Sequence, residues 1–103
     1  MSNTFKPYYA VIFTSVKADG DNNYEDVAKI MIELVATQEG FIGVESARNE
    51  IGITISYWES LEAIKNWKNN AEHLIVQQMG KEIFYKSYTT RVCKVEREYS
   101  FEK

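Results

Sequence analysis

The sequence is short of the residues that cross-link a chain or bind metals. Cys93 is its one cysteine, which excludes a disulfide bond within the chain and a cysteine-based metal site. Cys93 lies where apolar and polar residues alternate, so we expect a buried structural thiol there rather than a nucleophile. His73 is the one histidine, and a metal site built on two histidines is therefore excluded as well.

Long apolar runs and an excess of positive charge are also missing. No stretch approaches the roughly 20 apolar residues that span a bilayer, and residues 1–7 lack the apolar segment of a signal peptide. The net charge is −3 with both signs mixed along the chain, which does not favour nucleic-acid binding. We therefore expect a cytoplasmic protein with neither a nucleic-acid nor a membrane partner.

What the chain does have is an ordinary globular composition with many aromatic residues. Its 103 residues are 45% hydrophobic and 26% charged, which predicts one domain over residues 1–103 with a flexible N-terminus at 1–7. Seven Tyr, five Phe and two Trp are many for so short a chain. They indicate a bulky core, or else an aromatic-lined pocket or an interface.

Hydrophobic periodicity predicts six elements in the order strand, helix, strand, strand, helix, strand. This order predicts an α+β fold of the ferredoxin-like βαββαβ type, with a four-stranded antiparallel sheet and both helices on one face. Asn69-Asn70 should divide the second helical unit into two pieces, with a candidate pocket at the break. The predicted ranges are Tyr8–Val16, Tyr24–Thr37, Phe41–Asn49, Ile51–Trp58, Ser60–Lys68 with Ala71–Tyr85, and Tyr88–Tyr99.

The sheet face that the two helices leave uncovered should pack against a partner. Ile53 and Ile55 alternate with Thr54, Ser56 and Trp58, so the third strand is apolar on both sides. A bare face carrying Trp58 would be an exposed apolar patch, which usually marks an interface. We therefore expect a homodimer packed sheet against sheet; the alternative is a monomer with a few exposed aromatic side chains.

A family resemblance rests on the segment from Gly40 to His73 and its surroundings. The residues that carry it are Gln38-Glu39-Gly40-Phe41, Glu45-Ser46-Ala47-Arg48, Ser56-Tyr57-Trp58-Glu59-Ser60 and Trp67. With these residues the chain resembles the antibiotic biosynthesis monooxygenase (ABM) family of dimeric α/β-barrel proteins. The resemblance implies oxygen attack on an electron-rich aromatic or quinol-like substrate, with no metal or organic cofactor.

Haem-degrading members of the same family imply a second reading. They use an Asn on the first strand, a Trp on the second helix and a His further along as the iron ligand. Trp67 matches the Trp, whereas Phe13-Thr14 stands where the Asn is expected. His73 lies about one helical turn before the register near Gln77 where the ligand is expected. A haem cofactor ligated by His73 stays open as an alternative.

Seven residues are the predicted site. As catalytic residues we propose His73, as a general base or hydrogen-bond donor, and Trp67, as the wall of a pocket for a planar ligand. The alternatives are that His73 is a surface residue, Trp67 a core anchor, and Arg91 the partner of Glu45 in a cross-strand ion pair. The predicted substrate-binding residues are Phe13, Tyr57, Gln77, Tyr85 and Arg91.

Three functions remain open at this point. They are a cofactor-independent monooxygenase, a haem-binding or haem-degrading protein, and a non-enzymatic dimer that binds a small hydrophobic ligand. Because fold alone does not choose between them, the side chains around the pocket must.

Overall fold

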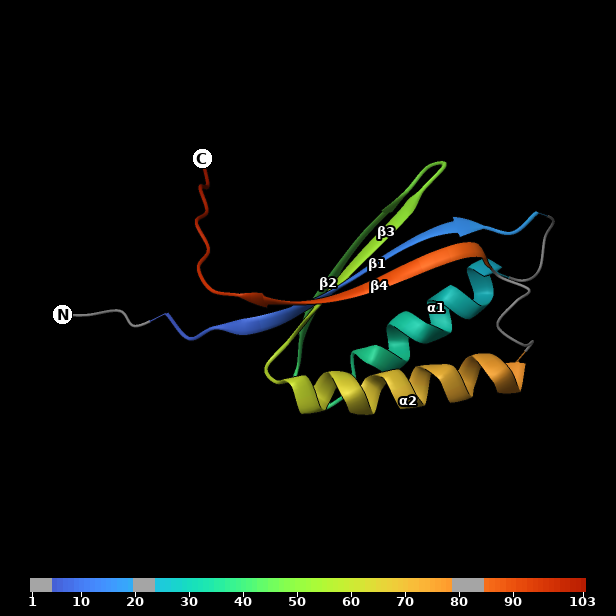
Figure 1. Cartoon of the computed structure of the whole chain (residues 1–103), viewed down its shortest axis with the longest axis horizontal. Helices are drawn as coiled ribbons and strands as arrows, with labels where there is room; N and C mark the ends of the chain where they lie inside the picture. The colour runs from blue at the N-terminus through green and yellow to red at the C-terminus, as the bar shows by residue number, and fades with distance from the viewer. Residues whose placement is uncertain (1–4, 20–23, 79–84) are drawn as a thin grey trace.

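The computed structural model describes residues 5–19, 24–78 and 85–103, and for residues 24 and 73–78 it describes the backbone. The strands pair antiparallel in the order β2-β3-β1-β4, and both helices lie on one face of the sheet (Figure 1). The predicted ferredoxin-like α+β fold is confirmed. The elements are β1 (Tyr8–Lys17), α1 (Tyr24–Val35), β2 (Phe41–Arg48), β3 (Gly52–Trp58), α2 (Leu61–Gln78) and β4 (Tyr85–Val95).

Local signals fix the connections around the helices. Glu25 and Asp26 occupy the first turn of α1, where the helix dipole favours negative charge. Gly40 follows α1 with a φ of 85°, a conformation that glycine adopts without the strain of a Cβ. Ser60 is the N-cap residue of α2: its Oγ accepts a hydrogen bond from the backbone N–H of Ala63 at 3.1 Å.

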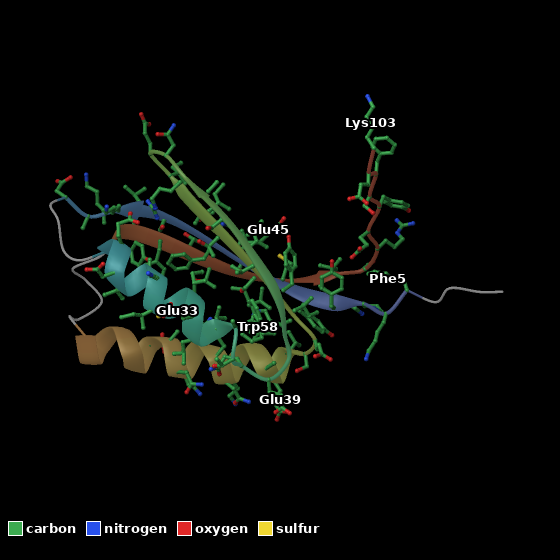
Figure 2. The ribbon with its side chains drawn as sticks, turned by 180° about the vertical axis from the view of Figure 1, so that it is seen from behind. Phe5, Glu33, Glu39, Glu45, Trp58 and Lys103 are labelled. Carbon is green, nitrogen blue, oxygen red and sulfur yellow. The ribbon has the colours of Figure 1, made fainter. Side chains whose placement is uncertain are left out.

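The core lies between the sheet and the first turns of α2. Trp58 is 0% exposed, and its indole Nε1 donates a hydrogen bond to Ser56 Oγ at 2.8 Å. Val35 and Ile64 pack in the same buried cluster. The predicted bare face carrying Trp58 is therefore wrong. Trp58 lies toward the helices (Figure 2), and alternation along β3 places Ser56 on the same side, while Tyr57 between them points the other way.

The second helix also differs from its prediction. It is continuous across Asn69-Asn70, so the predicted break between two pieces is wrong. Asparagine costs a helix only a fraction of a kilocalorie per mole relative to alanine, about 0.5–0.7. Asn70 Nδ2 also donates to Gln38 Oε1 at 2.9 Å, which ties the helix to the loop before β2.

The last strand begins earlier than predicted. Tyr85, placed at the end of a helix by periodicity, is the first residue of β4, and the strand ends at Val95 rather than Tyr99. Gly80, the predicted bend, lies outside the described residues. No helix in the described ranges combines the length and apolarity needed to cross a membrane.

Candidate functional site

Three aromatic side chains gather on the helix-facing side of the sheet. The ring centroid of Phe13 lies 5.3 Å from that of Tyr85 and 5.3 Å from that of Tyr88, and the two tyrosine rings are 5.8 Å apart. The pairing of β1 with β4 produces the cluster, since Tyr88 lies opposite Ser15 and Tyr85 opposite Lys17. We call Phe13, Tyr85 and Tyr88 the aromatic cluster. The cluster contains two of the predicted substrate-binding residues, Phe13 and Tyr85.

A guanidinium group lies beside the aromatic cluster. Arg48, at the end of β2, extends over Gly52 and donates a hydrogen bond to the hydroxyl of Ser15, a residue only 3% exposed. Arg48, Gly52, Ser15 and Tyr88 form one row across the four strands. Glycine leaves room for this crossing, because a Cβ at position 52 would meet the guanidinium.

Arg48 and Ser15 are absent from the predicted site. The sequence signal that could have found them is Gly52 between two apolar strand positions, which marks a close approach in a strand. An arginine held in this way presents hydrogen-bond donors that suit an anionic oxygen of a ligand.

The predicted catalytic residues lie on α2. Trp67 is half-buried and stacks on Trp58, with 6.2 Å between ring centroids and an interplanar angle of 26°. This position is that of the core anchor, the alternative reading of Trp67. His73 and Gln77 lie further along the same helix, and their side chains are outside the described part of the structure.

Tyr57 and Arg91 lie on the opposite side of the sheet, away from the aromatic cluster. Tyr57 donates to Glu45 Oε1 at 2.7 Å, and this hydrogen bond to a carboxylate raises the pKa of Tyr57. Arg91 and Glu45 stand on the two edge strands, β4 and β2, so the predicted cross-strand pair within one chain is wrong. Cys93 is exposed, and its predicted burial is wrong because none of the described helices and strands covers this face.

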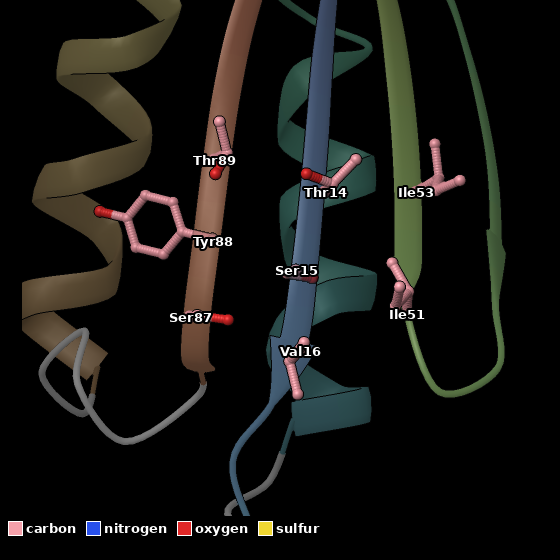
Figure 3. Close-up of a pocket in the computed structure, with 8 residues that line it drawn as sticks. All are labelled: Thr14, Ser15, Val16, Ile51, Ile53, Ser87, Tyr88 and Thr89. Carbon is pink, nitrogen blue, oxygen red and sulfur yellow. The ribbon is translucent and has the colours of Figure 1, made fainter.

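A hollow of about 370 Å³ opens at one end of that uncovered face (Figure 3). Its walls combine aliphatic side chains with hydroxyl groups. Among the described residues that line it, none carries a carboxylate or a basic group. The residues around it are Thr14, Ser15, Val16, Ile51, Ile53, Ser87, Tyr88 and Thr89.

Comparison with known proteins places this geometry in context. Protein YqjZ of Bacillus subtilis (strain 168) is 46% identical over 99 residues, which cover 94% of this chain and 87% of YqjZ. The structure of Rv0793 from Mycobacterium tuberculosis superposes with a TM-score of 0.73 at 15% identity, covering 91% of this chain and 99% of Rv0793. A candidate antibiotic biosynthesis monooxygenase from Bacillus cereus gives 0.60 at 24% identity, with 93% and 98% covered.

A variant of MhuD with two manganese protoporphyrin IX molecules bound per active site gives a TM-score of 0.68 at 15% identity, covering 90% of this chain and 99% of that chain. At these identities the solved structures show a shared fold and no more. The family model described as Antibiotic biosynthesis monooxygenase matches residues 7–78, more than half of the chain. Together with the identity to YqjZ, this match shows that the chain belongs to the antibiotic biosynthesis monooxygenase (ABM) family.

Proposed function

We propose that this protein is a cofactor-independent monooxygenase that oxidises a small phenol or quinol on the helix-facing side of its sheet. The observation that carries the proposal is the aromatic cluster, where Phe13, Tyr85 and Tyr88 lie within ring contact of one another. Half of Tyr88 remains exposed at 49%, so the cluster has aromatic surface left to contact a planar ligand. Membership of the ABM family supports the same class of reaction.

The reaction needs no external reductant. A phenol with a free para C–H reacts with O2 to give a quinone and water: one oxygen atom becomes the new carbonyl, and the other leaves as water with both hydrogens. The substrate supplies every electron that O2 accepts. What the protein must supply is removal of the phenol proton, orientation of the ring and exclusion of water.

We assign these tasks to Arg48, to rings of the aromatic cluster and to His73 on α2. The rings of Phe13 and Tyr88 orient the substrate by offset contact, and Arg48 stabilises the phenolate oxygen by hydrogen bonding. His73, further along α2, removes the phenol proton, because a histidine titrates close to neutral pH. In this assignment Trp67 supports the site from the core instead of touching the substrate.

A haem-degrading function is supported less well by the described residues. Position 13, where the resemblance expects an Asn, holds a phenylalanine packed between Tyr85 and Tyr88, and Thr14 points to the other side of the sheet. Trp67 is stacked on Trp58 in the core. Position 13 and Trp67 therefore do not fit the haem site that the resemblance implies.

We also propose that the protein is a homodimer. The sheet face turned away from the helices is uncovered, and we call it the open face, formed by alternate residues of every strand. Ile53 remains 43% exposed on it, next to the side chains of Ile12 and Ile55. An apolar sheet face of this kind is stabilised by burial against a partner.

Oxygen uptake tests the proposed reaction. Chelator-treated protein should consume O2 and convert at least one member of a panel of phenols and quinols to a quinone that carries one oxygen atom more than the substrate, without release of hydrogen peroxide. Phe13→Leu should lower kcat/KM about tenfold, the worth of an aromatic contact. Phe41→Leu, the same change in the core away from the cluster, is the matched control. No uptake with any substrate, or equal loss in both variants, would overturn the proposal.

A haem titration separates the alternative. Under the proposed function, any change in the absorbance spectrum of added haem does not depend on His73, so the original protein and His73→Ala give the same spectrum. A shift that is lost in this variant would favour the haem-binding function instead.

A further inference from the structure

A serine occupies a position of β1 where alternation predicts an apolar residue. Val11 and Phe13 lie on the helix-facing side of this strand, and Ser15 continues the same side. Ser15 is only 3% exposed, and a hydroxyl buried to this extent requires a hydrogen-bond partner. Arg48 provides it, because its Nη2 donates a hydrogen bond to Ser15 Oγ. The burial of Ser15 is therefore coupled to the placement of one guanidinium group.

Gly52 leaves the space through which Arg48 reaches Ser15. The three residues lie side by side on neighbouring strands, with Arg48 on β2, Gly52 on β3 and Ser15 on β1. A Cβ at position 52 would collide with Nη2, Cζ and Nε of Arg48, so the arginine crosses β3 directly over the glycine. We call Ser15 and Gly52 the arginine seat, since one accepts the hydrogen bond and the other leaves the room for it.

The arginine seat determines where the guanidinium lies relative to the aromatic cluster. Ser15 pairs with Tyr88 on the adjacent strand β4 (Figure 3), one strand spacing of about 4.8 Å away. A guanidinium is a rigid plane with five N–H donors, so a bond from one of them to a buried oxygen restricts the orientation of the whole group. An arginine that is restrained before a ligand arrives loses less side-chain entropy when the ligand binds.

We propose that Ser15 and Gly52 are positioning residues that hold Arg48 for an oxyanion, so that the site binds a phenol as its phenolate in preference to the neutral form. The inference rests on the proposed function and adds the residues that fix its anion-binding group. A hydrogen bond from a charged donor to an anionic oxygen is roughly twice as strong as one between neutral groups. A guanidinium displaced from the seat keeps its charge but moves into solvent, where its attraction for the phenolate is weaker.

The ionisation of para-nitrophenol in the presence of protein tests the preference. The para position of this probe is blocked, so the proposed reaction cannot convert it to a quinone, and its phenolate absorbs visible light where the phenol does not. Visible absorbance against pH gives the pKa of the probe, free and with saturating protein. The original protein should bind the phenolate about tenfold more tightly than the phenol, which lowers the pKa of the bound probe. Arg48→Met should abolish this effect.

Two variants of the arginine seat keep the charge and change its position. Gly52→Ala places a Cβ in the path of the arginine, and Ser15→Ala removes the oxygen that accepts its hydrogen bond. Each should lose most of the preference for the phenolate. Gly43→Ala is the matched control, because a Cβ there meets nothing within 4 Å, and it should keep the full preference. A cooperative transition in urea denaturation shows that each variant is folded.

The outcomes separate the arginine seat from the proposed oxidation. The same pKa of the bound probe in the original protein and in both seat variants would overturn the inference, and so would a preference that survives in Arg48→Met. Failure of the original protein to bind the probe would overturn it as well. None of these results bears on the oxidation, which oxygen uptake measures. A preference that Gly52→Ala and Ser15→Ala both remove supports the arginine seat even if the original protein consumes no oxygen.

Discussion

Trp67 lies stacked on Trp58, with 6.2 Å between ring centroids and 26° between ring planes, and Trp58 is completely buried. This contact makes Trp67 part of the core that packs α2 against the sheet. Trp67→Ala should lower the free energy of unfolding by about 2–3 kcal/mol, less than for a fully buried Trp because the side chain is half-buried. Urea denaturation measures the loss.

Trp67→Phe separates packing from chemistry. Phenylalanine retains a ring against Trp58, so stability should fall by less than in the alanine variant and oxygen uptake should persist. Activity lost in Trp67→Phe at unchanged stability would instead show that the indole contacts the substrate.

Gly40 is the position where a side chain should do most harm to the loop before β2. A Cβ there would lie 2.6 Å from the Cβ of Ala63, and the φ of 85° is strained for any other residue. Gly40→Ala should cost about 1–3 kcal/mol in the free energy of unfolding. Gly43→Ala is the matched control, because a Cβ there meets nothing within 4 Å. Equal midpoints for the two variants in thermal unfolding would contradict the argument.

The hydroxyl of Tyr8 should titrate late. It donates to Glu98 Oε1 at 2.5 Å, and this bond, followed by partial desolvation, raises the pKa of Tyr8 to about 12 from 10.0. Because the folded pKa is the higher one, the stabilisation is complete below pH 10 and is lost as the pH rises through 12. Tyrosinate absorbance should show one late-titrating group that Tyr8→Phe removes and Glu98→Gln shifts to lower pH. An unchanged curve in both variants would refute the assignment.

Cys93 offers a reporter of the proposed interface. It lies exposed on the open face, in the row that also contains Ala10 and Tyr57. A soluble thiol reagent should therefore label dilute, dissociated protein quickly and concentrated protein more slowly, as the second copy covers the face. The rate of labelling against protein concentration is the measurement. A rate independent of concentration across the dissociation range would place Cys93 outside the interface.

Most of the fold was predictable because its signals are local. The acidic first turn of α1, Gly40 after it and Ser60 before α2 are short-range features, and each functions as expected. The side occupied by Trp58 was not predictable. β3 carries apolar residues at both parities, so periodicity could not say which set faces the helices.

The site was harder to predict than the fold, because its contacts depend on register. Phe13 meets Tyr85 and Tyr88 only through the pairing of β1 with β4, and Arg48 reaches Ser15 only across β3. A sequence states neither strand order nor register. The same reason explains the misplaced pair of Glu45 and Arg91, whose strands lie at opposite edges.

The central position of β1 governs when this protein can fold. β1 pairs with β4 from Tyr8 opposite Val95 onward, so its second neighbour is synthesised only after both helices and the other strands. Until then one side of β1 offers unpaired backbone groups to any other nascent strand. Closing so long a loop is slow, since the chain loses much entropy before the contacts form. Folding of the complete sheet therefore waits for β4, and shortened chains that lack β4 should aggregate.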